Sequence, residues 1–268
     1  MADIRMGVIG CGGRMGRMLV AEIAAADGCE LSGGTTAPGS ATVGSDLGVL
    51  SGIGAIGIAA GSAAGELLGK SHVAIEFSIA AATASHATLA AELGTPLVIG
   101  TTGLSATETA AVEDAAKRIP IVWAANTSLG INLLLGLVEQ VAARLGPDWD
   151  VEIMEMHHRG KADAPSGTAL ALGRAAASGR RVALDDVAQR GRDGITGARR
   201  DGDIGFASLR GGDAVGDHHV IFASAGERLE LSHHATNRAI YAKGAVRAAH
   251  WVVGKPAGLY GMKEVLGL

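Results

Sequence analysis

The sequence predicts an α/β protein in two parts: a doubly wound domain built on a parallel sheet, and a second α/β domain whose sheet is mixed and mostly antiparallel. Two observations carry this prediction. Up to about residue 126, apolar runs typical of buried strands alternate with segments of helical spacing, as in a parallel sheet covered on both faces. Beyond that point, strands follow one another across short Gly- and charge-rich turns, which favours antiparallel pairing.

The elements of the first part follow in strict alternation. Arg5–Ile9 is short and apolar, as expected of a buried strand, and Leu19 and Ile23 share one face of the helix predicted next. Ser105 and Glu108 have the form of a capping box, which marks the start of a helix. We expect further strands at 29–34, 73–78, 96–100 and 121–124, helices at 15–26, 79–93 and 105–118, and a loop, short strand and small-residue turn across 47–65.

The second part begins and ends with a helix. Residues 130–145 and 240–253 have helical spacing, and 150–157 alternates like a strand. The segment 180–203 is rich in Arg, Asp and Gly and is predicted to be a long exposed connection. Three further strands are expected at 204–209, 218–223 and 228–233.

Composition excludes several classes of protein. The 268 residues, 48% hydrophobic and 19% charged, suffice for one large or two modest domains. A formal net charge of −4 argues against a nucleic-acid partner. Two cysteines, Cys11 and Cys29, are too few for a disulfide framework. The chain enters a strand at once, without a signal-peptide pattern, and the uncharged segment 47–65 is mostly Gly, Ala and Ser. We therefore expect a cytoplasmic protein that does not enter a membrane.

A glycine-rich turn, Gly10–Gly16 (Gly-Cys-Gly-Gly-Arg-Met-Gly), lies between the first strand and the first helix. Free N–H groups at a helix start bind the pyrophosphate of a dinucleotide, and glycines let the backbone come close to it. The spacing is a variant, because Met15 stands where the third glycine of the usual pattern belongs. We interpret the turn as a nicotinamide-dinucleotide site; the alternative is a tight turn that binds nothing.

The end of the second predicted strand gives no clear cofactor preference. An acid there would bind the ribose 2′-OH of NAD, and an Arg would favour the 2′-phosphate of NADP. The sequence instead reads Gly33-Gly34-Thr35-Thr36-Ala37. The cofactor is therefore expected to be NADH or NADPH, without strong discrimination.

The most informative stretch is Glu155–Ala169 (Glu-Met-His-His-Arg-Gly-Lys-Ala-Asp-Ala-Pro-Ser-Gly-Thr-Ala). A strand leads two histidines and two cations into a loop, and Ser166 is a good N-cap for the Ala-rich helix that follows. Cations, a hydroxyl and a helix N-terminus together suit a carboxylate, and a histidine there could donate a proton near neutral pH. The alternative is a solvated basic loop before a capped helix.

No metal site is predicted. The pairs His218-His219 and His233-His234 fall on predicted strands. Adjacent strand residues point to opposite faces, so such a pair cannot easily bind one metal ion.

The Glu155–Ala169 stretch resembles the signature of the 4-hydroxy-tetrahydrodipicolinate reductase (dihydrodipicolinate reductase) family of lysine and diaminopimelate biosynthesis. The resemblance covers nearly the whole chain. It extends to the Gly10–Gly16 turn and to the segments Gly100–Gly103, Ala124–Asn126, Ile204–Ala207 and Gly226–Glu230.

The resemblance implies a Rossmann-like dinucleotide-binding domain formed by residues 1–126 and 237–268, and a substrate-binding and tetramerisation domain formed by 127–236. It implies a small dicarboxylate substrate that is reduced by NADH or NADPH with loss of water, and a homotetramer. His157 and Lys161 would be the acid–base pair. Substrate carboxylates would meet His158, Lys161, Gly167 and Thr168. The cofactor would contact Gly10, Cys11, Gly12, Gly13, Arg14, Met15, Gly100, Thr101, Thr102, Ala124, Ala125, Asn126 and Thr127.

Some positions depart from the family pattern. Thr36 and Ala37 stand where an acid and an Arg are usual, Thr127 replaces a common aromatic residue, and Glu76 replaces a usual Asp. Two other functions stay open at this stage. A different oxidoreductase on the same scaffold would leave the segment from Lys161 to Thr168 without a role, and a non-catalytic dinucleotide sensor would have no use for His157 or Lys161.

Overall fold

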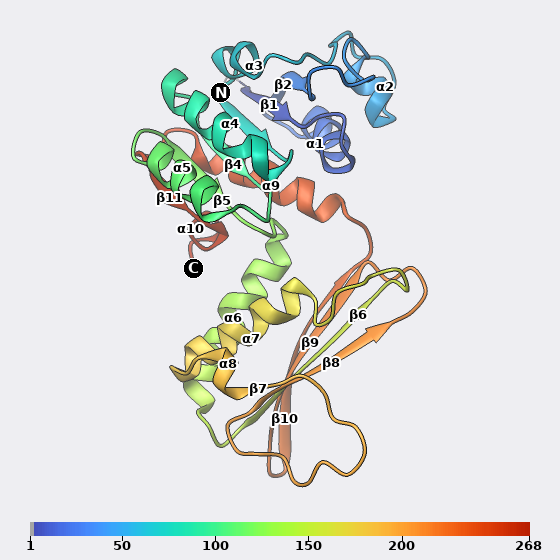
Figure 1. Ribbon diagram of the computed structural model, residues 1–268, viewed down its shortest axis with the longest axis vertical. Coiled ribbons are helices and arrows are strands. Elements are labelled where there is room, and N and C mark those ends of the chain that lie inside the picture. The colour runs from blue at the N-terminus through green and yellow to red at the C-terminus, as the bar shows by residue number, and fades with distance from the viewer. Residues whose placement is uncertain (1–2) are drawn as a thin grey trace. The chain divides into compact units, whose positions relative to one another are not determined.

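The computed structural model describes residues 3–268. It divides into two compact units, one formed by Met1–Leu129 with Ala239–Leu268 and the other by Gly130–Arg238 (Figure 1). The chain thus leaves the first unit near the start of a long helix and returns to it for its last 30 residues. Among residues 3–268, no helix combines the length and the apolar composition needed to cross a bilayer.

The first unit is built on a six-stranded parallel sheet in the order β11-β5-β4-β3-β1-β2. Its strands follow the predicted apolar runs, except that the edge strand β11 was not predicted. The bounds are β1 (Ile4–Ile9), β2 (Cys29–Thr35), β3 (Val73–Glu76), β4 (Leu97–Ile99), β5 (Pro120–Trp123) and β11 (Gly258–Tyr260).

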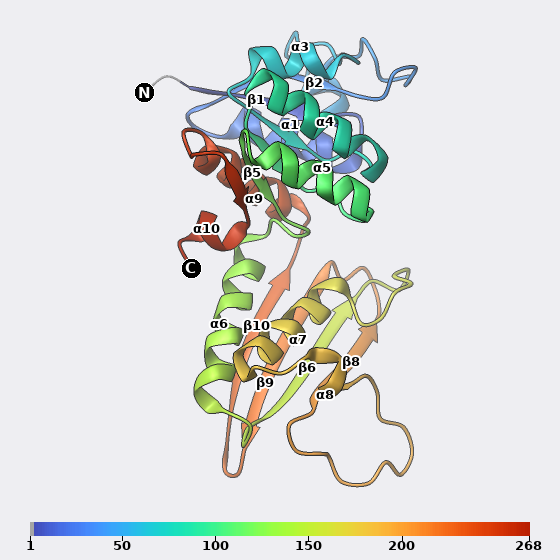
Figure 2. The ribbon, with the colours of Figure 1, turned by 60° about the vertical axis from the view of Figure 1, so that its left-hand side comes forward.

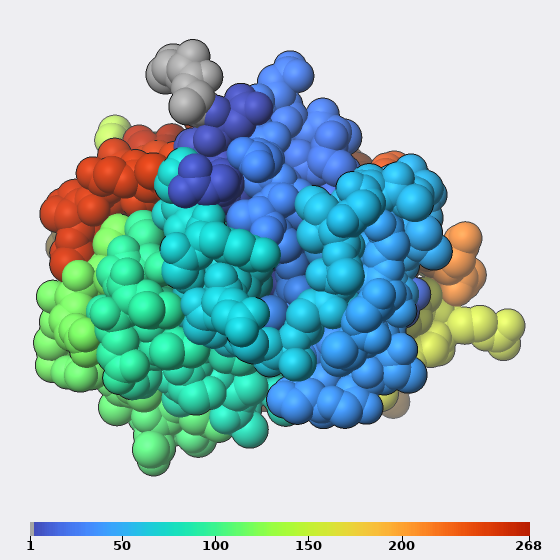
Figure 3. All heavy atoms as spheres, turned by 90° about the horizontal axis from the view of Figure 1, so that it is seen from above, coloured from blue at the N-terminus to red at the C-terminus, as the bar shows by residue number. Residues whose placement is uncertain are grey.

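Helices cover both faces of this sheet, as the doubly wound prediction requires. One face packs against α1 (Arg14–Ala25) and α9 (Ala239–Val252), and the other against α4 (Ala80–Leu93) and α5 (Ala106–Ala116). Ser105 caps α5 through the predicted capping box. Seen from above, the space-filling view shows residues of this unit in blue, cyan and green, with its C-terminal residues in red (Figure 3).

The segment 47–65 differs from its prediction. It begins with a one-turn helix, α2 (Leu47–Ser51), where a loop was expected, and it runs into α3 (Ala64–Lys70). The cause is Asp46, whose carboxylate accepts hydrogen bonds from the N–H groups of Gly48 (2.8 Å) and Gly57 (2.7 Å). One side chain therefore caps the helix and closes the loop that follows it, an arrangement that no periodicity indicates.

The second unit is a five-stranded mixed sheet in the order β10-β9-β6-β8-β7 (Figure 2). The antiparallel ladders β9–β10 and β6–β9 join nine and seven residue pairs, and the parallel ladders β6–β8 and β7–β8 join seven and two. The bounds are α6 (Leu129–Leu145), β6 (Asp150–His157), α7 (Gly167–Arg180), α8 (Leu184–Val187), β7 (Ala188–Gln189), β8 (Ile204–Arg210), β9 (Gly216–Ser224) and β10 (Glu227–Ala235).

The two faces of this second sheet are unlike. On one face, side chains such as Ile153, Phe206 and Val220 pack against α6, α7 and α8. On the other, the alternate residues of the strands include Met154, Ile221 and the half-exposed Leu209. Among the described residues, no helix contributes to a core on that second face. We call it the open face.

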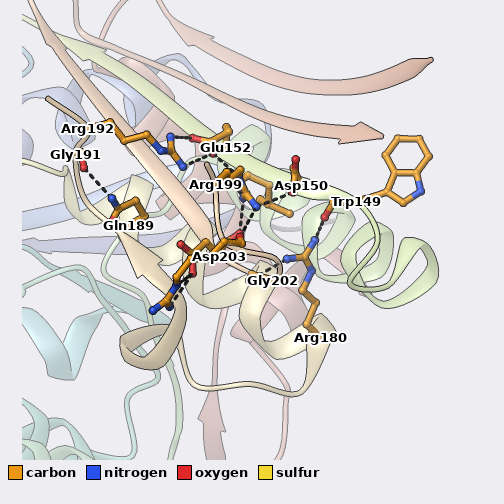
Figure 4. Close-up of polar contacts among 12 residues, drawn as sticks. Trp149, Asp150, Glu152, Arg180, Gln189, Gly191, Arg192, Arg199, Gly202 and Asp203 are labelled. Atoms are coloured by element: carbon orange, nitrogen blue, oxygen red, sulfur yellow. Dashed lines mark hydrogen bonds and ion pairs between the residues drawn. The ribbon is translucent and has the colours of Figure 1, made fainter. Parts of the chain in front are cut away.

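The connection 180–203 is less free than the sequence indicated. It contains α8 and β7, and its arginines bind carboxylates at the start of β6 (Figure 4). Arg199 is bonded to Asp150 (2.6 Å) and to Glu152 (3.0 Å), and Arg192 reaches Glu152 with two nitrogens, at 2.8 and 3.0 Å. The loop is exposed, as predicted, but a network of ion pairs anchors it to the sheet.

Candidate active site

The glycine turn lies at the carboxyl end of β1, where α1 begins. Gly10 has φ +89°, and a Cβ there would lie 2.2 Å from the carbonyl oxygen of Phe77. A Cβ on Gly16 would lie 2.1 Å from the oxygen of Gly10. Both positions therefore require glycine. The N-cap of α1 is Gly13, which has no side chain to occupy the first N–H groups of the helix. That end of α1 is open to an anion.

Two cavities meet the turn within the first unit. One of about 330 Å³ is lined by Gly10 and Gly13 and extends to Thr36, Ala37 and His86. The other, of about 600 Å³, is lined by Gly13, Arg14, Met15, Gly100, Thr101 and Thr102. They share Gly13, Phe77, Ser78 and Ile79, so together they follow the carboxyl ends of the strands from β2 to β4. A ligand that spans a topological switch point is expected at this edge of such a sheet.

The predicted cofactor residues are not all placed alike. Cys11 is fully buried beneath the turn, and burial raises the pKa of its thiol to about 11, so it is a packing residue and not a reactive one. The carbonyl oxygen of Gly12 accepts a hydrogen bond from Nε of Arg17 over 3.1 Å. Ala124–Thr127 lie in the link from β5 to α6 and line neither of these two cavities.

Glu76 holds together the segments that line these two cavities, a role that the sequence did not reveal. It is completely buried at the end of β3. Its carboxylate accepts hydrogen bonds from the hydroxyls of Thr101 (2.6 Å), Ser78 and Thr83 (3.3 Å), and lies 3.4 Å from Nδ1 of His86. These contacts tie α4 and the Gly100–Thr102 loop to one strand end. The signal in the sequence was an acid at the end of an apolar strand, noted only as a departure from the family pattern.

In the second unit, β6 delivers His157 at its last position. The Nδ1–H of His157 donates to Oε2 of Glu155 over 2.6 Å, and the ring is mostly buried. A Cβ on Gly216 would come within 3.0 Å of Nε2 of His157, so the small residue in β9 leaves room beside that atom. Nε2 is thus the atom of this ring that remains for a ligand.

Lys161 lies in the loop after β6, four residues beyond His157. Its ammonium group donates to both carboxylate oxygens of Asp163, over 2.8 and 3.0 Å, and its side chain is 21% exposed. Two backbone bonds shape this loop, from Lys161 N to the oxygen of His158 (3.1 Å) and from Arg159 N to the oxygen of Gly212 (3.2 Å). The lysine is held in place but remains accessible.

Helix α7 begins directly after this loop. Ser166 caps it as predicted, accepting a hydrogen bond from the N–H of Ala169 over 3.1 Å. Gly167 and Thr168 form the first turn, and a Cβ on Gly167 would meet nothing within 4 Å. The same segment thus brings His157, Lys161 and an approachable helix N-terminus into one short stretch of the second unit.

His218 is a member of this site that the sequence did not reveal. It lies on β9, 3% exposed, with its ring centroid 5.2 Å from that of His157 and Nε2 3.1 Å from Oγ of Ser166. Burial, together with the neighbouring His157, lowers the pKa of His218 to about 4. Sequence reasoning considered this residue only as half of a metal-binding pair, and its cross-strand pairing opposite Glu155 could not be seen without the strand register.

Comparisons with known proteins cover almost the whole chain. The family model described as "Dihydrodipicolinate reductase, N-terminus" matches residues 4–127, and "Dihydrodipicolinate reductase, C-terminus" matches residues 130–266. Two relatives named 4-hydroxy-tetrahydrodipicolinate reductase, from Afipia carboxidovorans and Parvibaculum lavamentivorans, are 52% and 53% identical over all of this chain and 98% and 99% of theirs.

A solved structure is similar as well. It is a dipicolinate-bound dihydrodipicolinate reductase from Paenisporosarcina sp. TG-14, 25% identical, with a TM-score of 0.79 over 98% of this chain and 99% of that one. Family models covering almost every residue, relatives above 50% identity over the full length and a matching fold lead to one conclusion. The chain belongs to the dihydrodipicolinate reductase family.

Proposed function

We propose that this protein reduces 4-hydroxy-tetrahydrodipicolinate to tetrahydrodipicolinate, with loss of water, at the expense of NADH or NADPH, in lysine and diaminopimelate biosynthesis. The observation that carries the proposal is the segment from His157 to Thr168. It presents a histidine, a lysine and a helix N-terminus in a chain whose full-length relatives carry this enzyme's name.

The first unit is the proposed dinucleotide-binding domain, corresponding to residues 1–126 and 237–268. The Gly10–Gly16 turn fits a dinucleotide for two reasons. Its backbone leaves no space for side chains at Gly10 and Gly16, and the start of α1 offers free N–H groups to a pyrophosphate. The cofactor, when bound, supplies a hydride for C4 of the substrate ring. Residues from the turn (Gly10, Cys11, Gly12, Gly13, Arg14, Met15), the β4–α5 loop (Gly100, Thr101, Thr102) and the β5–α6 link (Ala124, Ala125, Asn126, Thr127) would hold it.

The choice between NADH and NADPH rests on the end of β2. Thr36 offers a hydroxyl to the cavity there, and His86 is the one titratable side chain among the residues that line it. Neither a carboxylate that would repel a 2′-phosphate nor an arginine that would bind it belongs to that lining. We therefore propose that both cofactors serve.

The second unit is the proposed substrate domain, residues 127–236. A small dicarboxylate would place its carboxylates against the first N–H groups of α7 at Gly167 and Thr168 and against the side chains of His158 and Lys161. These groups suit an anion because a helix N-terminus and an ammonium group both stabilise negative charge. His157 and Lys161 would move the proton, which the ring requires at the carbon next to the one that is reduced.

The open face of the second sheet supports a homotetramer. Met154, Leu209 and Ile221 lie on that face, with no covering helix among the described residues. Apolar side chains left exposed on a sheet face are stabilised when another copy covers them. Sedimentation equilibrium would test the tetramer, and a monomer at micromolar concentration would exclude it. The two thiols, both unpaired, are compatible with a cytoplasmic location.

The function is tested by turnover. Purified protein is mixed with NADH or NADPH and with freshly generated synthase product, and the loss of nicotinamide absorbance is followed. The proposal expects oxidation of the cofactor that depends on this substrate. Binding without oxidation would instead identify a dinucleotide sensor, and oxidation only with amino-acid or aldehyde substrates would identify a different dehydrogenase.

A further inference from the structure

Glu155 is a buried carboxylate of β6 that does not belong to the proposed acid–base pair. It is 1% exposed. Its Oε1 accepts hydrogen bonds from Arg210 (2.9 Å) and from the N–H of Ser166 (3.2 Å), and its Oε2 accepts from Arg210 (2.9 Å) and from His157 (2.6 Å). A buried carboxylate with four donors from three segments is a costly arrangement unless its geometry serves a purpose.

The carboxylate fixes which nitrogen of His157 carries the hydrogen. Burial by itself would raise the pKa of Glu155, but the hydrogen bonds from Arg210 and His157 and the charge of Arg210 outweigh it and lower the pKa to about 2. Glu155 is therefore an anion with no proton to donate, so Nδ1 of His157 must be the donor in their contact. The neutral ring then keeps its lone pair on Nε2, the atom beside Gly216.

Arg210 extends this control to the lysine. Its guanidinium spans both oxygens of Glu155 and also donates to the backbone oxygen of Asp163 over 2.6 Å. Asp163 in turn holds the ammonium group of Lys161. The planar guanidinium, with its five donors, thus connects the carboxylate that binds the His157 ring to the loop that carries Lys161.

The other groups around His157 leave this arrangement undisturbed. The charged and titratable groups that face it are Glu155 from β6, Arg210 from β8 and His218 from β9. Burial keeps His218 neutral near physiological pH, and it is bonded to Ser166 instead of to Glu155. Glu155 and Arg210 therefore compensate one another, and the orientation of His157 depends on their contact.

We propose that Glu155 and Arg210 are positioning residues of the reductase site: Glu155 holds His157 in the Nδ1–H tautomer, and Arg210 ties that carboxylate to the loop that carries Lys161. This inference rests on the proposed function for the roles of His157 and Lys161. It adds two residues that touch neither substrate nor cofactor but determine the geometry of those that do.

Glu155→Gln tests the tautomer directly. The glutamine amide can place its NH2 group, itself a donor, at either oxygen position. At the Oε1 position the NH2 group would face two other donors, Ser166 N–H and Arg210. At the Oε2 position it would face only Arg210, because His157 can change tautomer and accept a hydrogen bond from it, so this orientation is favoured. We therefore expect the ¹⁵N spectrum of the labelled protein, recorded at about pH 8.5 where imidazoles are neutral, to move the His157 ring from Nδ1–H to Nε2–H. The matched control is Glu227→Gln on the same sheet, whose side chain is exposed at the β9–β10 turn and should leave the spectrum unchanged.

The kinetic readout separates positioning from folding. We expect kcat of Glu155→Gln to fall roughly 10²-fold, the lower end of what a positioned acid–base group contributes, with the substrate KM nearly unchanged. Arg210→Lys keeps the charge but cannot span three acceptors, so kcat should fall there too, while the control Arg174→Lys on the exposed side of α7 should keep it.

Retention of the Nδ1–H tautomer in Glu155→Gln, or full kcat in both Glu155→Gln and Arg210→Lys, would overturn the inference and leave the proposed function intact. Failure of the proposed function looks different: the unmodified protein would not turn over the substrate. In that case the tautomer shift alone still decides whether Glu155 orients His157.

Discussion

The glycine turn of the first unit and the His157–Thr168 segment of the second are built from different materials. The turn acts through its backbone. A Cβ added at Gly16 or Gly10 would lie 2.1 or 2.2 Å from a carbonyl oxygen, so both positions require glycine. The ligand would contact backbone N–H groups at the start of α1. The other segment is made of side chains joined by ion pairs, from Glu155 to Arg210 and from Lys161 to Asp163. A backbone cradle identifies a class of ligand, whereas a set of ionisable groups identifies a reaction.

The sharpest test of this difference removes the ammonium group from the second region. We expect Lys161→Ala to lower turnover by roughly 10²–10⁴-fold, the contribution of a positioned proton donor, because no other cation is bonded to Asp163's carboxylate in the loop. Cofactor affinity, measured by fluorescence titration with NADH, should hardly change. A variant with the full rate would remove Lys161 from the chemistry.

Acid should destabilise the second region in two stages. His218 has its pKa lowered from 6.5 to about 4, so the unfolded chain takes up a proton that the folded chain refuses, and stability falls as pH drops between these values. Glu155 has its pKa lowered from 4.5 to about 2, so its contribution is present above pH 4.5 and is lost as pH falls towards 2. Each stage lowers the free energy of unfolding by at most roughly 3 kcal/mol.

Urea unfolding of the intact protein at several pH values would measure these stages. His218→Gln should flatten the loss between pH 6.5 and 4 and leave the loss at lower pH in place. Equal slopes for this variant and the unmodified protein across the upper window would show that His218 does not titrate as described.

The backbone character of the first region predicts intolerance to a single methyl group. Gly16→Ala should cost roughly 1–3 kcal/mol of unfolding free energy, as overpacking does, and should weaken NADH binding, because the oxygen of Gly10 and the backbone of Cys11 must move. The control is Gly69→Ala in α3, where a Cβ meets nothing within 4 Å. That change should be neutral or stabilising, since alanine is the better helix former. Equal thermal melts and NADH affinities for the two variants would contradict the prediction.

The smallest expected effect concerns the choice of cofactor. With a threonine and an alanine at positions 36 and 37, NADH and NADPH should give kcat/KM values within about tenfold, or roughly 1.4 kcal/mol, of each other. Steady-state rates with both cofactors decide this. A much larger ratio would assign the ribose contact to residues outside Thr35–Ala37, with His86 in the same cavity as the first candidate.

Local pattern carried most of the fold. Apolar runs in the first unit, and alternation and turn residues in the second, predicted every long strand of both sheets, and Ser105 and Ser166 marked their helix starts correctly. Two short elements escaped: α2 forms around the Asp46 carboxylate, and β11 (Gly-Leu-Tyr) lacks the run of apolar residues that marked the equally short β4. Elements of this length carry no periodicity to detect.

The candidate site divides in the same way. Motif residues near one another in sequence, such as His157, Lys161 and Ser166, could be grouped from the chain alone. His218 and Arg210 could not, because they come from β9 and β8, and only the strand register places them beside Glu155.

The sequence by itself determined the fold class, the glycine turn, the capped helix after the His157 loop and the family to which these motifs are similar. These are properties of short segments, in which spacing and residue type impose the conformation directly. Only the tertiary structure decided that Cys11 is buried, that Glu76 ties Thr101 to the end of β3, and that Glu155 receives four donors. Those facts depend on which strands become neighbours, and the charge that compensates the buried Glu155 carboxylate comes from Arg210, 55 residues away in the sequence.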